Sequence, residues 1–376
     1  MFLSFIVFFL IFSLLILIHE LGHLLVAKKS GVRVDEFGFG FPPKLFGKKI
    51  KGTLYSINLI PFGGFVRIPG SEYEEGNKKD KGNFANKKPS TKFFILTGGI
   101  FMNLFLAIVL YYGLFIVTNF TSLPLFLMDD FSFRYGETKV TQNVIVYSQN
   151  NIFKPGDHIL QIRQDNNSNI AIAPQNPEEV INFIADKNDK NLIFKVQNVQ
   201  DSIIREVTAK TRYEESLGRF VVGIGLGESV NISYSRPLEK ILSPFLHSYN
   251  IFSYSGSIFK TLIKASIETK SAEPVAGTLT GPVGIFFIVE ALIKIGGVSA
   301  LMAIIDFTAL LSLSLAIMNI LPFPGLDGGH LVFVGYEVIF KKTPPLKFMR
   351  ITSSAGMAFL VVLAIFIAFK DFFMFR

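Results

Sequence analysis

The chain of 376 residues contains no cysteine. Disulfide bonds and thiolate metal sites are therefore excluded, although the absence of cysteine does not by itself indicate a compartment. Half of the residues are hydrophobic and 41 are phenylalanine, whereas only 18% are charged. This composition is typical of a membrane protein with enough polar sequence for one soluble domain.

A secretory signal peptide has a basic region before its apolar run and a small-residue cleavage site after it. The first long apolar run of this chain, from Phe2 to Val26, has neither. We therefore expect residues 1–27 to form a first transmembrane helix. Lys28 and Lys29 close the run, as is typical of a span whose C-terminal end faces the cytoplasm.

The net charge of +8 would indicate anionic partners in a soluble protein, but here the position of the charges relative to the spans matters more. Residues 28–92 contain fourteen Lys or Arg against six Asp or Glu. The positive-inside rule makes this segment cytoplasmic and places the N-terminus outside. Tyr55, Ile57 and Leu59 alternate with their neighbours in a strand-like pattern, which predicts a membrane-associated β region followed by a loop.

A second long apolar run predicts a transmembrane helix over residues 93–118. Residues 131–228 are the one soluble-looking segment, in which short β-rich pieces surround a helical stretch. About 100 residues suit one small α/β domain. Because two spans precede this domain and the N-terminus is outside, we expect the domain to lie outside the cytoplasm.

Two further transmembrane helices are expected, over residues 298–330 and 353–375. Residues 236–297 are mixed in character and predict an amphipathic or interfacial segment. Its apolar stretch from Val283 to Ile295 is too short for a full span. The predicted fold class is therefore a polytopic α-helical membrane protein with four transmembrane helices, a membrane-associated β-hairpin region and an extracytoplasmic α/β domain.

The first apolar run contains the sequence His19-Glu20-Leu21-Gly22-His23. On a helix, two imidazoles four residues apart project from one face and can bind one metal ion. Glu20 lies beside the first histidine, where a general base for a metal-bound water is expected. Ionisable groups in an apolar run are costly and indicate function. The alternative is a helix end with two histidines and a capping glutamate near the membrane surface.

A catalytic zinc ion normally has three protein ligands, so the two histidines need a partner. Residues 319–329 contain two prolines and three glycines that break the helix at the end of a span. Asp327 lies in this break and is the first candidate, although it could instead cap the next helix. His330 is the second candidate, because it could share a helical face with Asp327. The span count puts Asp327 on the same side of the membrane as His19 and His23.

Other polar residues also lie inside spans or at their ends. Asn103 follows two glycines in the second span, where it serves either helix packing or the lining of the site. Asp306 precedes Asp327 by 21 residues, roughly 30 Å of helix, which places it near the opposite surface. Asn319 carries its amide at the broken helix end, where it could hydrogen-bond a substrate strand.

These features resemble the site-2 proteases, which are intramembrane zinc metalloproteases, and within them the bacterial RseP/RasP-like branch with one PDZ domain. The resemblance rests on His19–His23, on the stretch from Asn319 to Gly328, and on the turn Phe153–Leu160, which is similar to a turn of PDZ domains. Residues Gly99–Asn103 are similar to the family's G-P-x-x-N element, with Ile100 where proline is usual.

The resemblance implies a zinc cofactor with His19, His23 and Asp327 as ligands and with Glu20 as general acid and base. It implies cleavage of transmembrane segments of single-pass membrane proteins, such as an anti-sigma factor or a signal-peptide remnant. The expected substrate-binding residues are the following: Asn319, Asn103, Tyr55, Ile57 and Leu59. A substrate strand added beside residues 55–59 would satisfy its exposed backbone.

The same resemblance implies a location in the bacterial cytoplasmic (inner) membrane, with the N-terminus and the PDZ-like domain outside the cytoplasm. The PDZ-like domain is expected to contact the substrate or a regulator. The lipid bilayer is the other expected partner, and no nucleic acid is expected.

Two other classes of function use the same sequence features. A membrane-bound PDZ scaffold would bind partners without chemistry, and a Glu20→Gln variant would then behave as the wild type. An ion or metal transporter would use the same ligands for passage, but no internal repeat is visible to support it.

Overall fold

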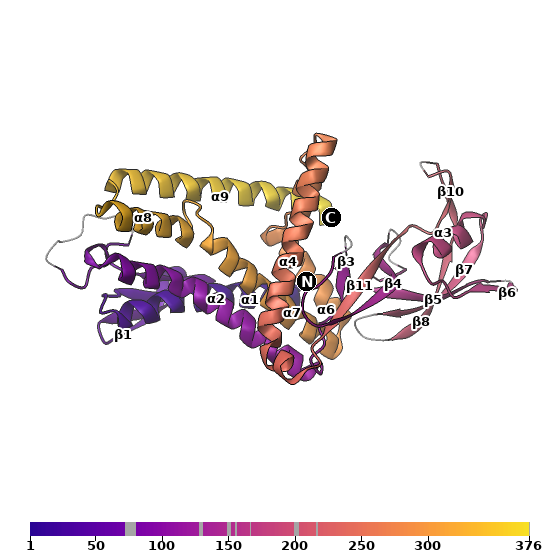
Figure 1. Cartoon of the computed structure of the whole chain (residues 1–376), viewed down its shortest axis with the longest axis horizontal. Helices are drawn as coiled ribbons and strands as arrows, with labels where there is room; N and C mark the ends of the chain where they lie inside the picture. Colours follow the sequence, from indigo (N-terminus) through magenta and orange to yellow (C-terminus); the bar gives the residue numbers. More distant parts are fainter. Residues whose placement is uncertain are drawn as a thin grey trace. The chain divides into compact units, whose positions relative to one another are not determined.

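The structure is a computed structural model, and it describes residues 1–71, 80–127, 131–148, 152–154, 156–165, 167–198, 203–215 and 217–375. The chain forms two units, Met1–Tyr112 with Glu273–Arg376, and Gly113–Ala272. Figure 1 labels their helices and strands. Residues 72–79 of the predicted loop and Pro155 of the predicted PDZ-like turn lie outside the described residues.

Four helices are long and apolar enough to cross a membrane. They are α1 (Phe2–Lys29), α2 (Pro89–Val117), α7 (Gly297–Ile320) and α9 (Leu346–Phe375). A bilayer requires about 20 predominantly apolar residues, and each of these helices exceeds that length. The predicted fold class, with four transmembrane helices and additional β-sheets, is confirmed. The short apolar stretch before α7 forms α6 (Pro282–Ile295), whose 14 residues are too few for a span.

The first unit is built on a close crossing of α1 and α2. A Cβ atom at Gly22 of α1 would lie only 2.1 Å from the carbonyl oxygen of Gly98 in α2, so the two backbones touch. Glycine permits this approach because it has no side chain. Leu24 and Ile95 are buried on either side of the crossing and hold it with apolar contacts.

Two long antiparallel strands, β1 (Glu36–Ile50) and β2 (Thr53–Arg67), pack against α1. Each strand bends back on itself, so Tyr55 pairs with Phe37 on one side and with Lys48 on the other. Phe37 in turn also pairs with Val66. The sheet therefore has four rows of paired backbone, in which residues 53–57 are an inner row and residues 64–67 are an outer row.

The predicted third span of residues 298–330 is divided in the structure. Helix α7 ends at Ile320, and six residues separate it from the start of α8 (Asp327–Phe340). The loop between them turns sharply at Gly325, whose φ of +95° is unfavourable for residues with a side chain. A Cβ atom at Gly328 would lie 2.0 Å from the carbonyl oxygen of Leu321, so the start of α8 folds tightly against this loop.

Helices α6 and α9 complete the first unit, together with α5 (Glu273–Thr278) and the short helix Phe84–Asn86. Helix α9 touches the loop after α7, because a Cβ atom at Gly356 would lie 2.0 Å from the carbonyl oxygen of Pro324. Near its C-terminal end, Asp371 accepts hydrogen bonds from the backbone N–H groups of Gly281 and Gly284 at the start of α6. Helix α9 is thus attached to the rest of the unit in its first half and near its C-terminal end.

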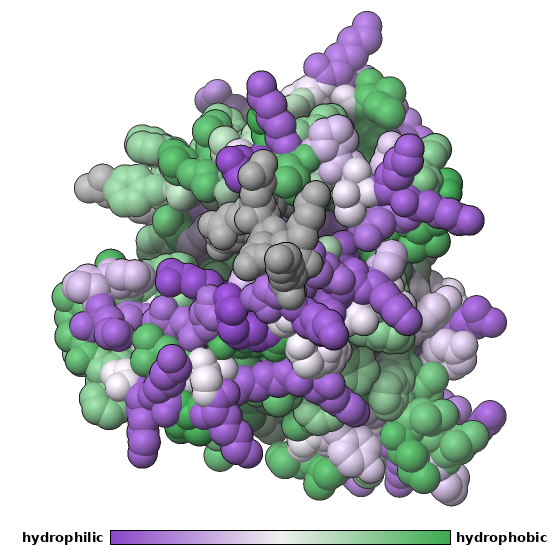
Figure 2. All heavy atoms as spheres, turned by 90° about the vertical axis from the view of Figure 1, so that its left-hand side faces the viewer, coloured by the Kyte–Doolittle hydropathy of each residue, from purple (hydrophilic) through white to green (hydrophobic). Residues whose placement is uncertain are grey.

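Hydrophilic side chains gather over the end of the first unit at which α9 begins, as Figure 2 shows. Exposed basic residues between α8 and α9 and at the start of α9 contribute to this end, namely Lys341, Lys342, Lys347 and Arg350. Helix α1 ends there with Lys28 and Lys29, and Lys87 before α2 donates a hydrogen bond to the Gly31 carbonyl just beyond α1. The basic residues that follow α1, precede α2 and lie at the start of α9 are thus all at the same end of these helices.

The second unit contains a sheet with the strand order β3-β11-β4-β5-β7-β8, in which β6 pairs with β5, and all its pairs are antiparallel. Its strands are β3 (Leu125–Leu127), β4 (Glu137–Ser148), β5 (Asp157–Gln164), β6 (Asn167–Ile172), β7 (Asn191–Asn198), β8 (Ile204–Lys210) and β11 (Ile224–Ser233). A small hairpin of β9 (Arg212–Glu214) and β10 (Arg219–Val221) adjoins it.

Helix α3 (Pro177–Ala185) covers the core of this sheet, where Val180 and Ile184 pack with buried strand residues such as Ile159 and Phe194. Asn176 caps the helix by accepting a hydrogen bond from the Glu179 N–H. The sheet continues into α4 (Pro237–Thr269), a 33-residue helix. The second unit is thus longer at both ends than the predicted soluble segment of residues 131–228.

Candidate metal centre

Helix α1 presents His19 and His23 on one face, as their spacing of four residues predicts. The two Nε2 atoms are 3.2 Å apart. His23 is buried and His19 is largely buried, with side-chain exposures of 7% and 13%. Both nitrogens therefore point at one small volume that is mostly shielded from solvent.

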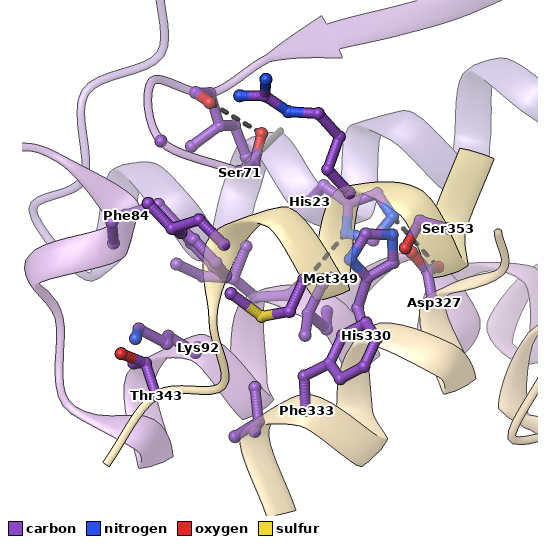
Figure 3. A pocket seen from close by; sticks show the side chains of 18 of the residues that line it. His23, Ser71, Phe84, Lys92, Asp327, His330, Phe333, Thr343, Met349 and Ser353 are labelled. Atoms are coloured by element: carbon purple, nitrogen blue, oxygen red, sulfur yellow. Dashed lines mark hydrogen bonds and ion pairs between the residues drawn. The ribbon is translucent and has the colours of Figure 1, made fainter. Parts of the chain in front are cut away.

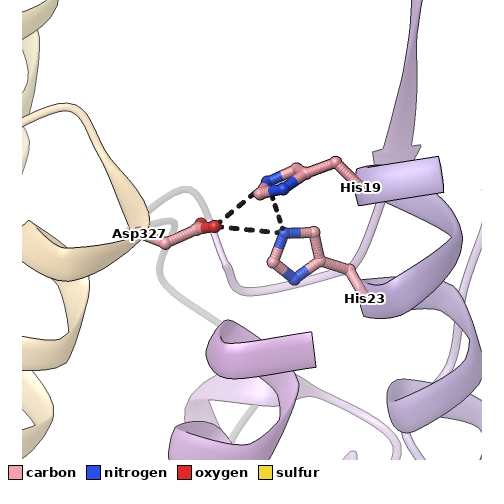
Figure 4. A group of neighbouring side chains, drawn as sticks. All are labelled: His19, His23 and Asp327. Carbon is pink, nitrogen blue, oxygen red and sulfur yellow. Dashed lines mark hydrogen bonds and ion pairs between the residues drawn. The ribbon is translucent and has the colours of Figure 1, made fainter. Parts of the chain in front are cut away.

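Asp327 reaches this volume from the first turn of α8, as Figure 4 shows. Its Oδ2 atom lies 3.1 Å from His19 Nε2 and 3.3 Å from His23 Nε2. The tight loop before α8 positions it, because glycines at 328 and 329 let the helix start fold against the carbonyls of the loop. Asp327 Oδ2 makes no hydrogen bond of acceptable geometry with the described residues, although two nitrogens lie within 3.3 Å.

This donor set fits a zinc ion. A tetrahedral zinc ion with bonds of about 2.0–2.1 Å holds its ligand atoms about 3.3 Å apart, and the three separations here are 3.1, 3.2 and 3.3 Å. Two imidazoles and one carboxylate are also common ligands of catalytic zinc. Among the described residues, His19, His23 and Asp327 form the one group of at least three potential ligands with such close atoms.

A main-chain carbonyl holds the ring of His23. The Nδ1 atom lies 2.8 Å from the carbonyl oxygen of Ile95 in α2. A carbonyl oxygen only accepts hydrogen bonds, so Nδ1 carries the proton and Nε2 presents its lone pair to the metal position. The close crossing of Gly22 and Gly98 places the two helices near enough for this bond.

The ring of His19 has a different neighbour. Its Nδ1 atom lies 3.3 Å from the amide nitrogen of Asn103 in α2. Asn103 is buried, with 1% exposure, and its backbone carbonyl accepts a hydrogen bond from the Ser312 hydroxyl of α7. Helices α1, α2 and α7 therefore meet behind His19.

Glu20 lies next to these ligands and lines the same cavity as both histidines and Asp327. Val66 of β2 lines the cavity beside it. The outer row of the sheet therefore borders the centre. A carboxylate held beside the metal position has the placement that a general base requires.

The cavity has a volume of about 1210 Å³ and is shown in Figure 3. Its walls come from the C-terminal end of β2, the start of α2, helix α8 and the first half of α9. Lys92 of α2 and Glu337 of α8 form an ion pair of 2.8 Å in its wall, with side-chain exposures of 6% and 18%. This pair joins α2 to α8 in the cavity wall, and the sequence pattern did not indicate it.

His330, the second candidate ligand, also lines the cavity and is labelled in Figure 3. It does not belong to the close group formed by His19, His23 and Asp327. Asp306 lies in α7, partly buried, and does not line the cavity. The geometry therefore favours Asp327 as the third ligand.

None of the five residues expected to bind substrate lines this cavity in the described part of the chain. Asn319 donates its amide to the carbonyl of Leu315 within α7, at 3.1 Å. Ile57 and Leu59 are about half exposed, at 50% and 54%, and Tyr55 accepts a hydrogen bond from Lys28. The expected addition of a strand beside residues 55–59 meets an obstacle, because residues 55–57 already pair with β1 on both sides.

Comparisons with known proteins give a family and several relatives for the chain. A family model described as Peptidase family M50 matches residues 7–363. The chain is 30% identical over 368 residues to a protein of Clostridium perfringens, and the alignment covers 96% of each chain. It is 29% identical over 392 residues to a protein of Helicobacter pylori, and this alignment covers 98% of each chain. Both relatives are described as a "putative zinc metalloprotease".

Proposed function

The chain belongs to peptidase family M50, and on this premise we propose that it is a site-2-type protease of the RseP/RasP-like branch that cleaves transmembrane segments of single-pass membrane proteins. It is a zinc metalloprotease embedded in a membrane through several helices. The observation that best supports the proposal is the convergence of Asp327 with His19 and His23, which lie on a candidate transmembrane helix.

In this proposal His19, His23 and Asp327 hold the zinc ion, and Glu20 is the general acid and base. A zinc ion bound there supplies a Lewis acid that polarises a peptide carbonyl and lowers the pKa of a water molecule. Glu20 accepts a proton from the attacking water and donates it to the leaving amide nitrogen. The partly shielded cavity limits competing contacts with bulk water at these groups.

The substrate must expose its backbone, because a transmembrane helix uses its carbonyls in internal hydrogen bonds. The outer row of the sheet, residues 64–67, offers a place for the unwound segment. It pairs with β1 on one side, and Val66 lines the cavity beside Glu20. We therefore move the proposed strand addition from residues 55–59 to residues 64–67. The exposed side chains of Ile57 and Leu59 and the amide of Asn319 stay predicted substrate contacts.

We further propose that the basic end of the helices faces the cytoplasm of a bacterium, with the N-terminus and residues 131–228 outside. The charges around α1 and between α8 and α9 support this orientation. Because the chain has no cysteine, single exposed substitutions can be labelled cleanly. In right-side-out vesicles, an impermeant thiol reagent should label Lys260→Cys but not Lys342→Cys, and the reverse result would contradict the orientation.

The proposal assigns residues 131–228 to a PDZ-like domain that contacts the substrate or a regulator and restricts cleavage to substrates whose outer part has been trimmed. The sheet and helix of the second unit are compatible with a small binding domain. A variant that lacks residues 131–228 should cut untrimmed substrate. If it still cuts trimmed substrate but rejects the untrimmed form, the domain is not the filter.

Cleavage of a purified single-pass substrate in detergent or liposomes tests the main proposal. The wild type should cut it, a chelator should abolish cleavage, and added zinc should restore it. Glu20→Gln should lose activity by roughly 10²–10⁴-fold, the range of general acid–base catalysis. Glu268→Gln, on the exposed surface of α4, is the matched control and should act as the wild type. Cleavage that is equal in all samples would overturn the proposal.

A further inference from the structure

The side chain of Asn103 lies behind His19, and one of its two polar atoms has no hydrogen-bond partner among the described residues. Its amide nitrogen lies 3.3 Å from His19 Nδ1. Its amide oxygen is buried and has no hydrogen-bond partner among the described residues. A buried amide oxygen without a hydrogen-bond donor destabilises the folded protein. A donor within reach of this oxygen would therefore stabilise it.

The two histidines of the centre differ in what stands behind them. His23 donates from Nδ1 to the Ile95 carbonyl, and its Nε2 atom is therefore free to bind a metal ion. At His19 a donor, the amide N–H₂ of Asn103, faces Nδ1. A donor in this place needs a lone pair on Nδ1 and leaves the proton on Nε2, the atom nearest to Asp327 Oδ2. In that tautomer Nε2 cannot bind a metal ion.

A half-turn of the Asn103 amide removes the conflict. It exchanges the amide oxygen and nitrogen, which have nearly the same shape, without moving any other group. The oxygen then accepts a hydrogen bond from His19 Nδ1–H, and the Nε2 lone pair points to the metal position. The buried oxygen gains its missing partner in the same step.

We propose that Asn103 is a positioning residue of the metal centre, whose amide oxygen holds His19 in the tautomer that binds zinc. The inference rests on the proposed metal site and adds a residue to it. It replaces the expectation that Asn103 contacts the substrate, because its side chain is buried behind the ligand and does not line the cavity.

Helix packing alone does not account for the side chain. The bond that joins α2 to α7 at this position runs from the Ser312 hydroxyl to the backbone carbonyl of Asn103, at 2.7 Å. Any residue at 103 would keep that bond, because the acceptor is the main-chain carbonyl of residue 103. The two roles can therefore be separated by substitutions at 103 and at 312.

Zinc affinity of the purified full-length protein, measured by competition with a chromophoric chelator, tests the proposal without using activity. Asn103→Leu, which has a similar size and no acceptor, should weaken zinc binding about 10–100-fold, the usual effect of losing such a partner. Asn103→Asp, whose carboxylate accepts hydrogen bonds, should bind zinc within a few-fold of the wild type. Ser312→Ala loses the α2–α7 bond and should bind zinc as the wild type does.

Cobalt(II) in place of zinc adds a second readout, because its visible absorption reports the geometry of the ligands. Asn103→Leu should alter this spectrum, whereas Ser312→Ala should leave it unchanged. If Asn103→Leu does not fold, Asn103→Met serves as the apolar variant. Equal zinc affinity in the wild type and the apolar variant would overturn the inference, and so would an equal loss in Asn103→Asp. A wild type that binds no zinc would overturn the metal centre itself, which is a different result.

Discussion

Gly99 of α2 lies directly against the ring of His23 of α1. A Cβ atom at position 99 would be 2.5 Å from His23 Nε2, the nitrogen that faces the metal position, and would also crowd the ring of His19 at 2.8 Å from Nδ1. Real Cβ atoms do not approach other atoms so closely. Helix α2 thus supplies a bare stretch of backbone as one wall of the metal centre.

Gly99→Ala should therefore damage the metal centre although it adds one methyl group. We expect zinc affinity to fall roughly tenfold or more, because the imidazoles must turn away from Asp327. Alanine favours a helix over glycine by about 1 kcal/mol, so a loss cannot result from weaker helix formation. Gly113→Ala on the same helix meets nothing within 4 Å and is the matched control. Zinc competition should separate the two, and equal affinities would refute the close packing.

The Lys92–Glu337 ion pair should behave as a coupled unit. Removing one partner leaves a mostly buried charge alone, and for fully buried pairs this costs about 3–5 kcal/mol. Because Glu337 keeps 18% exposure, we expect a smaller loss, about 2 kcal/mol, for Lys92→Met. Lys92→Met combined with Glu337→Leu should recover most of the thermal stability. Additive losses in this double-mutant cycle would show that the two side chains are not coupled.

Asp371 near the end of α9 should contribute to stability through α6. Its carboxylate has 1% side-chain exposure and accepts from the N–H groups of Gly281 and Gly284, at 2.8 and 3.0 Å. Helix α6 has no side-chain cap of its own, so Asp371→Ala leaves buried donors unpaired at a cost of about 1–3 kcal/mol. Asp371→Asn keeps one acceptor oxygen and should lose less.

Thermal unfolding in detergent, with hydrogen exchange of α6, measures this effect. Phe373→Ala, at a side chain that is 75% exposed, is the control and should leave the exchange of α6 unchanged. Faster exchange in α6 for Asp371→Ala, but not for the control, is the expected pattern. Similar exchange in all three proteins would mean that the carboxylate does not hold α6.

The second unit should lose stability in mild acid because of His247 in α4. Burial lowers the pKa of His247 to about 3, below the ordinary value of about 6.5, and its ring faces the Tyr234 hydroxyl and the Phe115 ring. Between these two values the unfolded chain binds more protons than the folded one. The free energy of unfolding therefore decreases as the pH falls from about 6.5 towards about 3, by at most about 1.4 kcal/mol per pH unit.

His247→Phe removes this proton-binding site and should flatten the pH dependence. Hydrogen exchange of β11 and α4 in the intact protein, corrected for intrinsic rates, gives the local stability at each pH. Burial also lowers the pKa of His158 in β5, so His158→Gln is the comparison variant. An unchanged slope in His247→Phe would show that another group is responsible.

Local patterns predicted a large part of this protein. The spacing of His19 and His23 puts both rings on one face through helix geometry alone. The lengths of the apolar runs predicted four spans, and the structure contains four candidate spans. The prolines and glycines between Asn319 and Asp327 predicted a break in the helix, which the structure places after Ile320.

The sequence by itself predicted two of the proposed ligands, the proposed general base and the number of spans, because these depend on residues close together in the chain. Sequence patterns left His330 as a second candidate for the third ligand, and the tertiary structure brings Asp327, one helical turn away, into the close group with the histidines. It also showed which atoms stand behind the histidines: the Ile95 carbonyl, the Asn103 amide and the bare backbone at Gly99. Main-chain atoms are alike in every residue, so no pattern of side chains can predict that the Ile95 carbonyl and the backbone at Gly99 face these ligands.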